Sequence, residues 1–98
     1  KIIAAHFGGY LMLDKAWEHL IGKDLYIDTT WPPSLRTIGN PGEITKIIKR
    51  HGPDKILFGT DCPFSSQADE IDYIMDLPIA SEQKQMILGG NAGYLLDL

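Results

Sequence analysis

The sequence has 98 residues, which is enough for one small domain at most. Its 44% hydrophobic and 22% charged residues are ordinary for a folded globular chain and argue against extended disorder. The net charge of −4 argues against a nucleic-acid or anionic-membrane partner, and the one basic concentration, residues 46–50, lies inside a helical pattern.

Three short runs predict strands. The first and third are apolar throughout most of their length, as in parallel strands covered on both faces, and the second is rich in β-branched and aromatic residues. The runs are residues 2–5, 25–30 and 55–60. Glycine or proline follows each run within a few positions and ends the strand.

Apolar residues at helical spacing fill the intervals between these runs. We expect a first helix over residues 10–21 with Gly22 at its C-cap, and a second that starts at Asn40 and Pro41 and stops at Gly52. Ser66 is expected to cap a third helix. The expected inward-facing residues of the last two are Ile44, Ile47 and Ile48, then Ile71, Ile74 and Met75.

The last segment is expected to be a helical tail. Ser81 opens a short helix through Leu88, Gly89 and Gly90 break it, and Asn91 caps a final turn. The resulting order is β-α-β-α-β-α followed by this tail, which predicts an α/β fold with a parallel sheet.

Residues able to bind a metal follow two of the three strands. His6 comes after the first strand and Asp61 after the third. In (β/α) folds the residues that perform chemistry lie just past the carboxyl ends of the strands, so the two side chains are expected to converge. A catalytic metal needs about three protein ligands, and this pair provides only two. The alternatives are an Asx turn at Asp61 and a structural histidine at His6.

Other polar or reactive residues are interpreted structurally. Trp31, which precedes two prolines, either lines a pocket mouth or belongs to a packed loop. His19 is expected at the surface, and His51 in the last turn of its helix, where a cation complements the helix dipole. Cys62 lacks an identifiable base; as the single cysteine it excludes an internal disulfide and suits a reducing cytoplasm. No apolar run reaches the roughly 20 residues of a membrane span.

Three segments in this order resemble the amidohydrolase superfamily, in particular its amidohydrolase-2 branch of metal-dependent TIM-barrel hydrolases and decarboxylases. They are residues 3–9 (IAAHFGG), 56–63 (ILFGTDCP) and 87–96 (ILGGNAGYLL). The resemblance implies that the strands are the last three of a (β/α)8 barrel and that residues 1–98 form a partial domain from its C-terminal part. The family's first-strand His-x-His pair and fifth-strand histidine have no counterpart here.

The resemblance also implies roles for individual residues. Asp61 matches the family's metal-binding aspartate, which accepts a proton from the attacking water. His6 matches a histidine that binds substrate or assists at the metal, and Trp31 is expected to contact substrate. The implied cofactor is a divalent metal ion, with zinc expected. The implied function is hydrolysis of C–N or C–O bonds of a small molecule, and the alternatives are a decarboxylase of the same superfamily and a non-catalytic α/β interaction module.

The start at Lys1 suggests a fragment, and a barrel of this kind needs about 200 residues or more. We therefore expect the 98-residue chain alone to be inactive. A partial barrel leaves open sheet edges, which favour pairing with another chain, so a homo-oligomer is expected.

Overall fold

A parallel sheet of three strands forms the centre of the protein in a computed structural model, which describes residues 2–5, 15, 18–30, 41–60 and 66–97. The strands, in their order across the sheet, are β1 (Ile3–Ala4), β2 (Tyr26–Asp28) and β3 (Ile56–Leu57). Ala4, Ile27 and Ile56 are aligned across them. The expected parallel α/β arrangement is confirmed, although each strand is shorter than the run that predicted it.

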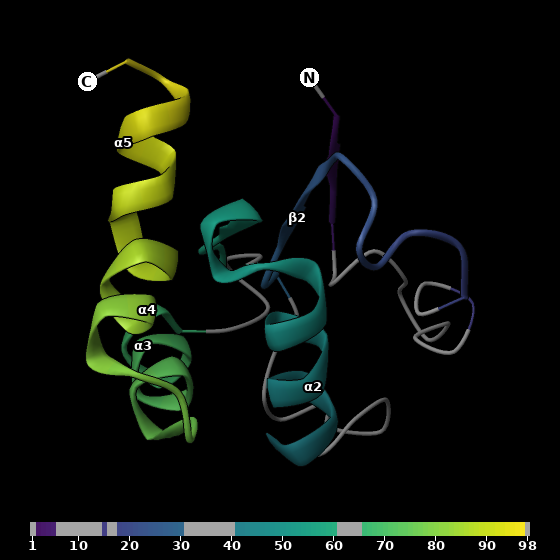
Figure 1. Ribbon diagram of the computed structural model, residues 1–98. Helices are drawn as coiled ribbons and strands as arrows, with labels where there is room; N and C mark the ends of the chain where they lie inside the picture. The colour runs from purple at the N-terminus through teal and green to yellow at the C-terminus, as the bar shows by residue number, and fades with distance from the viewer. Residues whose placement is uncertain (1, 6–14, 16–17, 31–40, 61–65, 98) are drawn as a thin grey trace.

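Helices connect the strands and follow the last one. They are α2 (Pro41–His51), the 3-10 helix η3 (Pro53–Lys55), α3 (Gln67–Asp76), α4 (Ser81–Gln85), the π-helix η4 (Met86–Gly90) and α5 (Asn91–Leu95). In Figure 1 β1 and β2 run downward and α2 runs back upward beside them. Most of the expected first helix lies outside the described residues, with helical structure at Lys15, Glu18 and His19.

Buried aliphatic side chains from the sheet and the helices form one core. The central strand residues Ile27 and Ile56 are fully buried. The core comprises Ile21, Ile27, Ile44, Ile47, Ile48, Ile56, Ile74, Leu77 and Ile87. Burial of this apolar surface is what holds the helices against the sheet.

The second helix forms as the sequence predicts. It begins at Pro41, and its expected inward residues Ile44, Ile47 and Ile48 are all buried. Gly52 follows with a φ of 104°, and its N–H donates to the carbonyl of Ile48 at 3.0 Å. A left-handed residue of this kind ends a helix and is accessible to glycine without strain.

The third helix has a different inward face from the one expected. Ser66 caps it as predicted, because its hydroxyl accepts a hydrogen bond from the Asp69 N–H at 3.1 Å. Of the expected stripe only Ile74 is buried, whereas Ile71 and Met75 are 40% and 49% exposed. The buried row instead includes Glu70. The expectation for Ile71 and Met75 was wrong because hydrophobicity alone does not anticipate a buried acid.

The expected break at Gly89 and Gly90 does not occur. The backbone passes from α4 through the π-helix η4 into α5, and the Asn91 N–H donates to the carbonyl of Met86, five residues earlier. Asn91 itself has helical dihedral angles, φ −66° and ψ −42°, so it does not cap the final turn. Its side chain is buried instead and bonds to the sheet region, which explains why the helix continues. Among the described helices none is both long enough and apolar enough to cross a membrane.

Candidate functional site

The carboxyl ends of all three strands lie at the same end of the sheet, because the strands are parallel and aligned in register. We call this the carboxyl end of the sheet and the opposite one the amino end. Neighbouring strands are about 4.8 Å apart, so β1 and β3 are separated by about 10 Å with β2 between them. Residues that follow the strands therefore leave the sheet close together.

The residues expected to perform the chemistry follow these strand ends directly in the sequence. His6 comes two residues after β1, and Asp61 comes four residues after β3. His6, Trp31, Asp61 and Cys62 lie outside the described residues, so their roles stay predictions.

Thr29 joins the segment that follows β2 to the segment that follows β3. Its N–H donates to the carbonyl of Leu57 at 3.0 Å, which continues the parallel ladder past Asp28. Its hydroxyl Oγ1 then accepts from the Gly59 N–H at 3.1 Å and donates to the Gly59 carbonyl at 3.3 Å. The side chain of Thr29 thus takes the place of a backbone rung and fixes the chain two residues before Asp61. Sequence reasoning missed this role, since threonine is common in strands for other reasons.

Thr30 makes the approach between the two strand ends unusually close. Its N–H donates to Oδ1 of Asp28 at 3.1 Å, and its hydroxyl donates to the same oxygen. The methyl carbon Cγ2 of Thr30 would lie 2.2 Å from a Cβ atom placed on Gly59. Only glycine therefore fits at position 59 with this arrangement of Thr30.

The described residues at the carboxyl end provide only part of what a metal site needs. Within the ranges that the structure describes, no three His, Cys, Asp or Glu side chains gather where they could hold a metal ion. Oδ1 of Asp28 is engaged by Thr30. Asp61, to which the resemblance gives the metal-binding role, lies outside these ranges, so that role stays a prediction.

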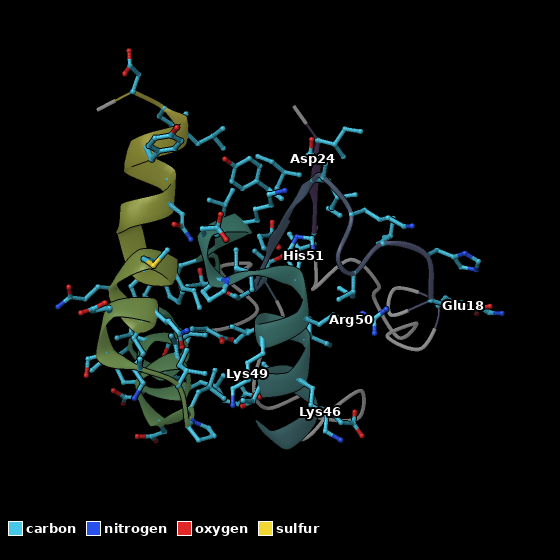
Figure 2. All side chains as sticks on the ribbon, in the orientation of Figure 1. Glu18, Asp24, Lys46, Lys49, Arg50 and His51 are labelled. Carbon is cyan, nitrogen blue, oxygen red and sulfur yellow. The ribbon has the colours of Figure 1, made fainter. Side chains whose placement is uncertain are left out.

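At the amino end of the sheet, His51 joins the end of α2 to the turn that leads into β2 (Figure 2). Its ring nitrogen Nδ1 accepts from the Gly22 N–H at 3.0 Å, and Nε2 lies 2.7 Å from the carbonyl oxygen of Leu25. A backbone N–H can only donate and a carbonyl can only accept, so Nε2 carries the proton and the ring is neutral. Burial lowers the pKa of His51 below its usual value, against the opposing bond to the Leu25 carbonyl. His51 does lie in the last turn of α2 and has the expected structural role, but the expectation that it acts as a cation was wrong.

Gly22 supplies the left-handed conformation that this turn requires. Its φ is 88°, as expected of a helix C-cap glycine, and the N–H of Lys23 donates to the carbonyl of Leu20 at 3.0 Å. The positive φ expected at Gly22 is present, but its N–H bonds to Nδ1 of His51, so its role as the C-cap of the first helix stays a prediction.

Asn91 also acts at the amino end of the sheet. Its side-chain nitrogen Nδ2 donates to the carbonyl of Pro53 at 2.6 Å and to that of Ile56 at 2.8 Å. Asn91 is only 6% exposed, so α5 is fixed to the start of β3 by a buried bond and to η3 by a partly buried one. The two partners of Asn91 lie 38 and 35 positions away in the sequence, and a sequence pattern gives no signal for contacts over such separations.

The comparison with protein families decides the ancestry of the chain. The family model described as "Amidohydrolase" (Amidohydro_2) matches residues 1–98. The chain belongs to this amidohydrolase family. No curated protein matches the sequence.

Solved structures similar to this amidohydrolase chain are decarboxylases. One is a 2,6-dihydroxybenzoate decarboxylase from Rhizobium, with 25% identity and a TM-score of 0.70 over 99% of the chain. Another is a dihydroxybenzoic acid decarboxylase from a Polaromonas species, crystallised with manganese and the inhibitor 2-nitroresorcinol, with 24% identity and a TM-score of 0.72 over 100% of the chain. A 5-carboxyvanillate decarboxylase from Sphingomonas paucimobilis gives 19% identity and a TM-score of 0.71 over 100% of the chain.

The chain spans about a third of these decarboxylases, 34% of each of the three. The likeness shows that the amidohydrolase chain has the fold of that third.

Proposed function

We propose that this chain supplies the last three β/α units of a (β/α)8 barrel in a metal-dependent decarboxylase of a small aromatic carboxylate. The supporting observation is the sheet itself: three strands consecutive in the sequence lie side by side and parallel, with their carboxyl ends at one end. In such barrels that end carries the active site. The substrate class comes from the decarboxylases that the chain resembles. The proposed location of the enzyme is the cytoplasm.

Hydrolysis of C–N or C–O bonds is the second candidate. It is the primary expectation from the resemblance stated above, and the family description "Amidohydrolase" favours it. The solved structures support decarboxylation better, since the three compared here are decarboxylases. Both reactions use the same end of the sheet.

The chain's donors fit a divalent metal ion only as part of a larger set. A carboxylate suits Mn²⁺, Mg²⁺ and Zn²⁺, and we assign this role to Asp61, while the remaining ligands come from outside the chain. The ion when bound supplies Lewis-acid polarisation of a substrate oxygen. The manganese of the Polaromonas enzyme makes manganese as plausible as the zinc expected from the resemblance.

The chain's own residues then bind substrate and move a proton. In decarboxylation a C–C bond breaks, CO₂ leaves, and the carbon that carried it takes up a proton, which the Asp61 carboxylate can take from solvent water and pass on. In hydrolysis the same group accepts a proton from the attacking water. His6 and Trp31 are assigned to substrate. Thr29 and Gly59 hold the backbone that leads to Asp61.

An assay of a protein of decarboxylase length that contains this chain tests the proposal. We expect Mn²⁺- or Zn²⁺-dependent release of CO₂ from a dihydroxybenzoate, and a decrease in kcat of about 10²–10⁴-fold for Asp61→Asn. Asp69→Asn, an exposed residue at the start of α3, is the matched control and should keep full activity. Amide or ester hydrolysis without CO₂ release would select the second candidate. Full metal content in Asp61→Ala would favour the non-catalytic module.

The 98-residue chain by itself is proposed to be inactive and to associate. The N–H of Tyr26 donates to the carbonyl of Ile2, and because carbonyl directions alternate along a strand, the polar backbone groups of Ile3 face away from β2. Ile2 and Ile3 are 67% and 49% exposed at this edge. Such an edge pairs readily with a second copy. Light scattering is expected to give more than the monomer mass, and a monomer at high concentration, or robust turnover with added metal, contradicts these expectations.

A further inference from the structure

The turn between residues 22 and 25 is fixed to the second helix by one buried imidazole. His51 is 6% exposed and bonds through both ring nitrogens, to the N–H of Gly22 and the carbonyl of Leu25. These two partners are the first and last residues of the turn, and Tyr26, the first residue of the central strand, follows directly. The bond to the Leu25 carbonyl requires a proton on Nε2, and the bond from the Gly22 N–H requires an unprotonated Nδ1, so only the neutral ring makes both.

We propose that His51 is a proton-sensitive latch that holds this turn, and with it the start of β2, only while its Nδ1 is unprotonated. Addition of a proton to Nδ1 places a ring N–H against the Gly22 N–H at a nitrogen–nitrogen distance of 3.0 Å. Two donors cannot bond to each other, so the contact becomes repulsive while the bond to Leu25 remains. The turn is then released on the Gly22 side. The inference rests on this geometry alone and does not depend on the proposed function.

Two charged groups near the ring act on its pKa in opposite directions. Lys55, from η3, lowers the pKa of His51, and Asp54, from the same helix, raises it. Nζ of Lys55 is paired with Oδ1 of Asp24 at 2.8 Å, which connects the turn to η3 in addition to the connection that His51 makes to α2. Lys23 in the turn is exposed. Desolvation of the ring is the larger influence and disfavours the charged form.

The sign of the pH effect follows from linkage. The folded protein holds the pKa of His51 below the unfolded value of about 6.5, so below that pH the unfolded chain binds the proton and the folded chain does not. The contribution of His51 to the stability of the folded protein is therefore fully present above a pH of about 6.5. It is lost as the pH falls through the pKa that His51 has in the folded protein. The folding equilibrium constant then falls by up to about tenfold per pH unit in that window.

Nitrogen-15 NMR of the 98-residue chain tests the latch directly. At pH 7.5 we expect the proton of the His51 ring on Nε2 and slow hydrogen exchange of the Gly22 amide. On acidification, exchange at Gly22 should accelerate together with protonation of His51, at a midpoint below 6.5. A ring with its proton on Nδ1 at pH 7.5, or a Gly22 amide that stays protected after His51 is protonated, overturns the proposal.

Two variants separate this effect from the titration of other groups. Asn at position 51 can place an oxygen near the Nδ1 position as an acceptor that does not titrate. Between pH 7.5 and 5.5 the folding equilibrium constant should fall in both proteins. The fall in the unmodified chain should be larger than the fall in His51→Asn by a factor of up to about ten. His19→Gln, at an exposed position, should keep the full response. An equal response in His51→Asn and the unmodified chain refutes the latch. If His51→Asn does not fold, the NMR result on the unmodified chain decides.

Discussion

The two ends of the sheet are held together by different kinds of contact. At the amino end, His51 and Asn91 reach across to backbone groups 26 to 38 positions away and are buried. At the carboxyl end, Thr29 and Gly59 fasten β2 to β3 through a hydroxyl, and Thr30 fits against a glycine. An imidazole and an amide side chain anchor the amino end. At the carboxyl end, threonine side chains and a glycine bring two strands close together.

This difference agrees with the division of labour in (β/α) barrels, where stability concentrates at the amino ends of the strands and chemistry at the carboxyl ends. The hydrogen bonds of His51 and Asn91 join segments that are far apart in the sequence and so connect neighbouring β/α units. The close approach at Gly59 sets the spacing at which the segments leading to Trp31 and Asp61 leave the sheet. Loss of a buried side-chain anchor at the amino end should therefore cost more folding free energy than changes at the carboxyl end.

The largest effect is expected for Asn91→Ala. This change removes the donor to two carbonyls, those of Pro53 and Ile56, at a buried position. Each unsatisfied buried carbonyl costs about 1–3 kcal/mol, so the free energy of unfolding should fall by about 3 kcal/mol. Urea unfolding measures it, with Gln85→Ala, at an exposed position in α4, as the control. A loss no larger than that of the control would show that the amino end is not anchored through Asn91.

Gly59→Ala is the strongest test at the carboxyl end. A Cβ there would lie 2.2 Å from Cγ2 of Thr30, and Gly59 does not have a positive φ, so the cost comes from this contact. Overpacking of this kind costs about 2 kcal/mol. Thr30→Ser removes the methyl group and keeps the hydroxyl, so the double variant should recover most of the loss. A double-mutant cycle measures the coupling, and additive effects would contradict the close approach.

The sequence predicted features whose cause is local. Pro41, Gly52 and Ser66 mark helix boundaries through their own backbone or side-chain chemistry, and the structure places the boundaries there. The alternation of strands and helices predicted the parallel sheet, because a helix between two strands returns the chain to the end of the sheet where the first strand began. Gly22 likewise acts through its own positive φ.

Features that depend on distant partners were misread or missed. Gly90 would weaken an isolated helix, but the hydrogen bonds of Asn91 keep the helical path through it. The neutral form of His51 follows from the Gly22 N–H, 29 positions away, which no pattern around residue 51 reveals. The role of Thr29 depends on Gly59, 30 positions away. At the candidate site, the sequence named Asp61 and His6 by resemblance, and their roles stay predictions.

Thr29→Val should have a smaller effect than the two changes above. Valine keeps the shape of the side chain and loses the hydroxyl that bonds to the N–H and carbonyl of Gly59. We expect a loss of about 1 kcal/mol in the free energy of unfolding, since the partly buried N–H of Gly59 is left without its acceptor. Thr29→Ser keeps the hydroxyl and should retain the bonds. Faster hydrogen exchange of the Gly59 amide in the valine variant, and not in the serine variant, is the specific readout.

The smallest effect is expected for Asp24→Asn, although this residue also joins the turn to η3 at the amino end. Its carboxylate hydrogen-bonds to Nζ of Lys55 and raises the pKa of Lys55 above its usual value. A lysine whose pKa is raised in the folded protein contributes stability that is fully present below the unfolded pKa of about 10.4. This contribution is lost as the pH rises through the folded pKa. The Asp24 side chain is fully exposed, so water and salt screen the pair and urea unfolding at pH 7 should barely change. A loss comparable to that of Asn91→Ala would mean that surface charge, and not buried hydrogen bonding, holds the amino end together.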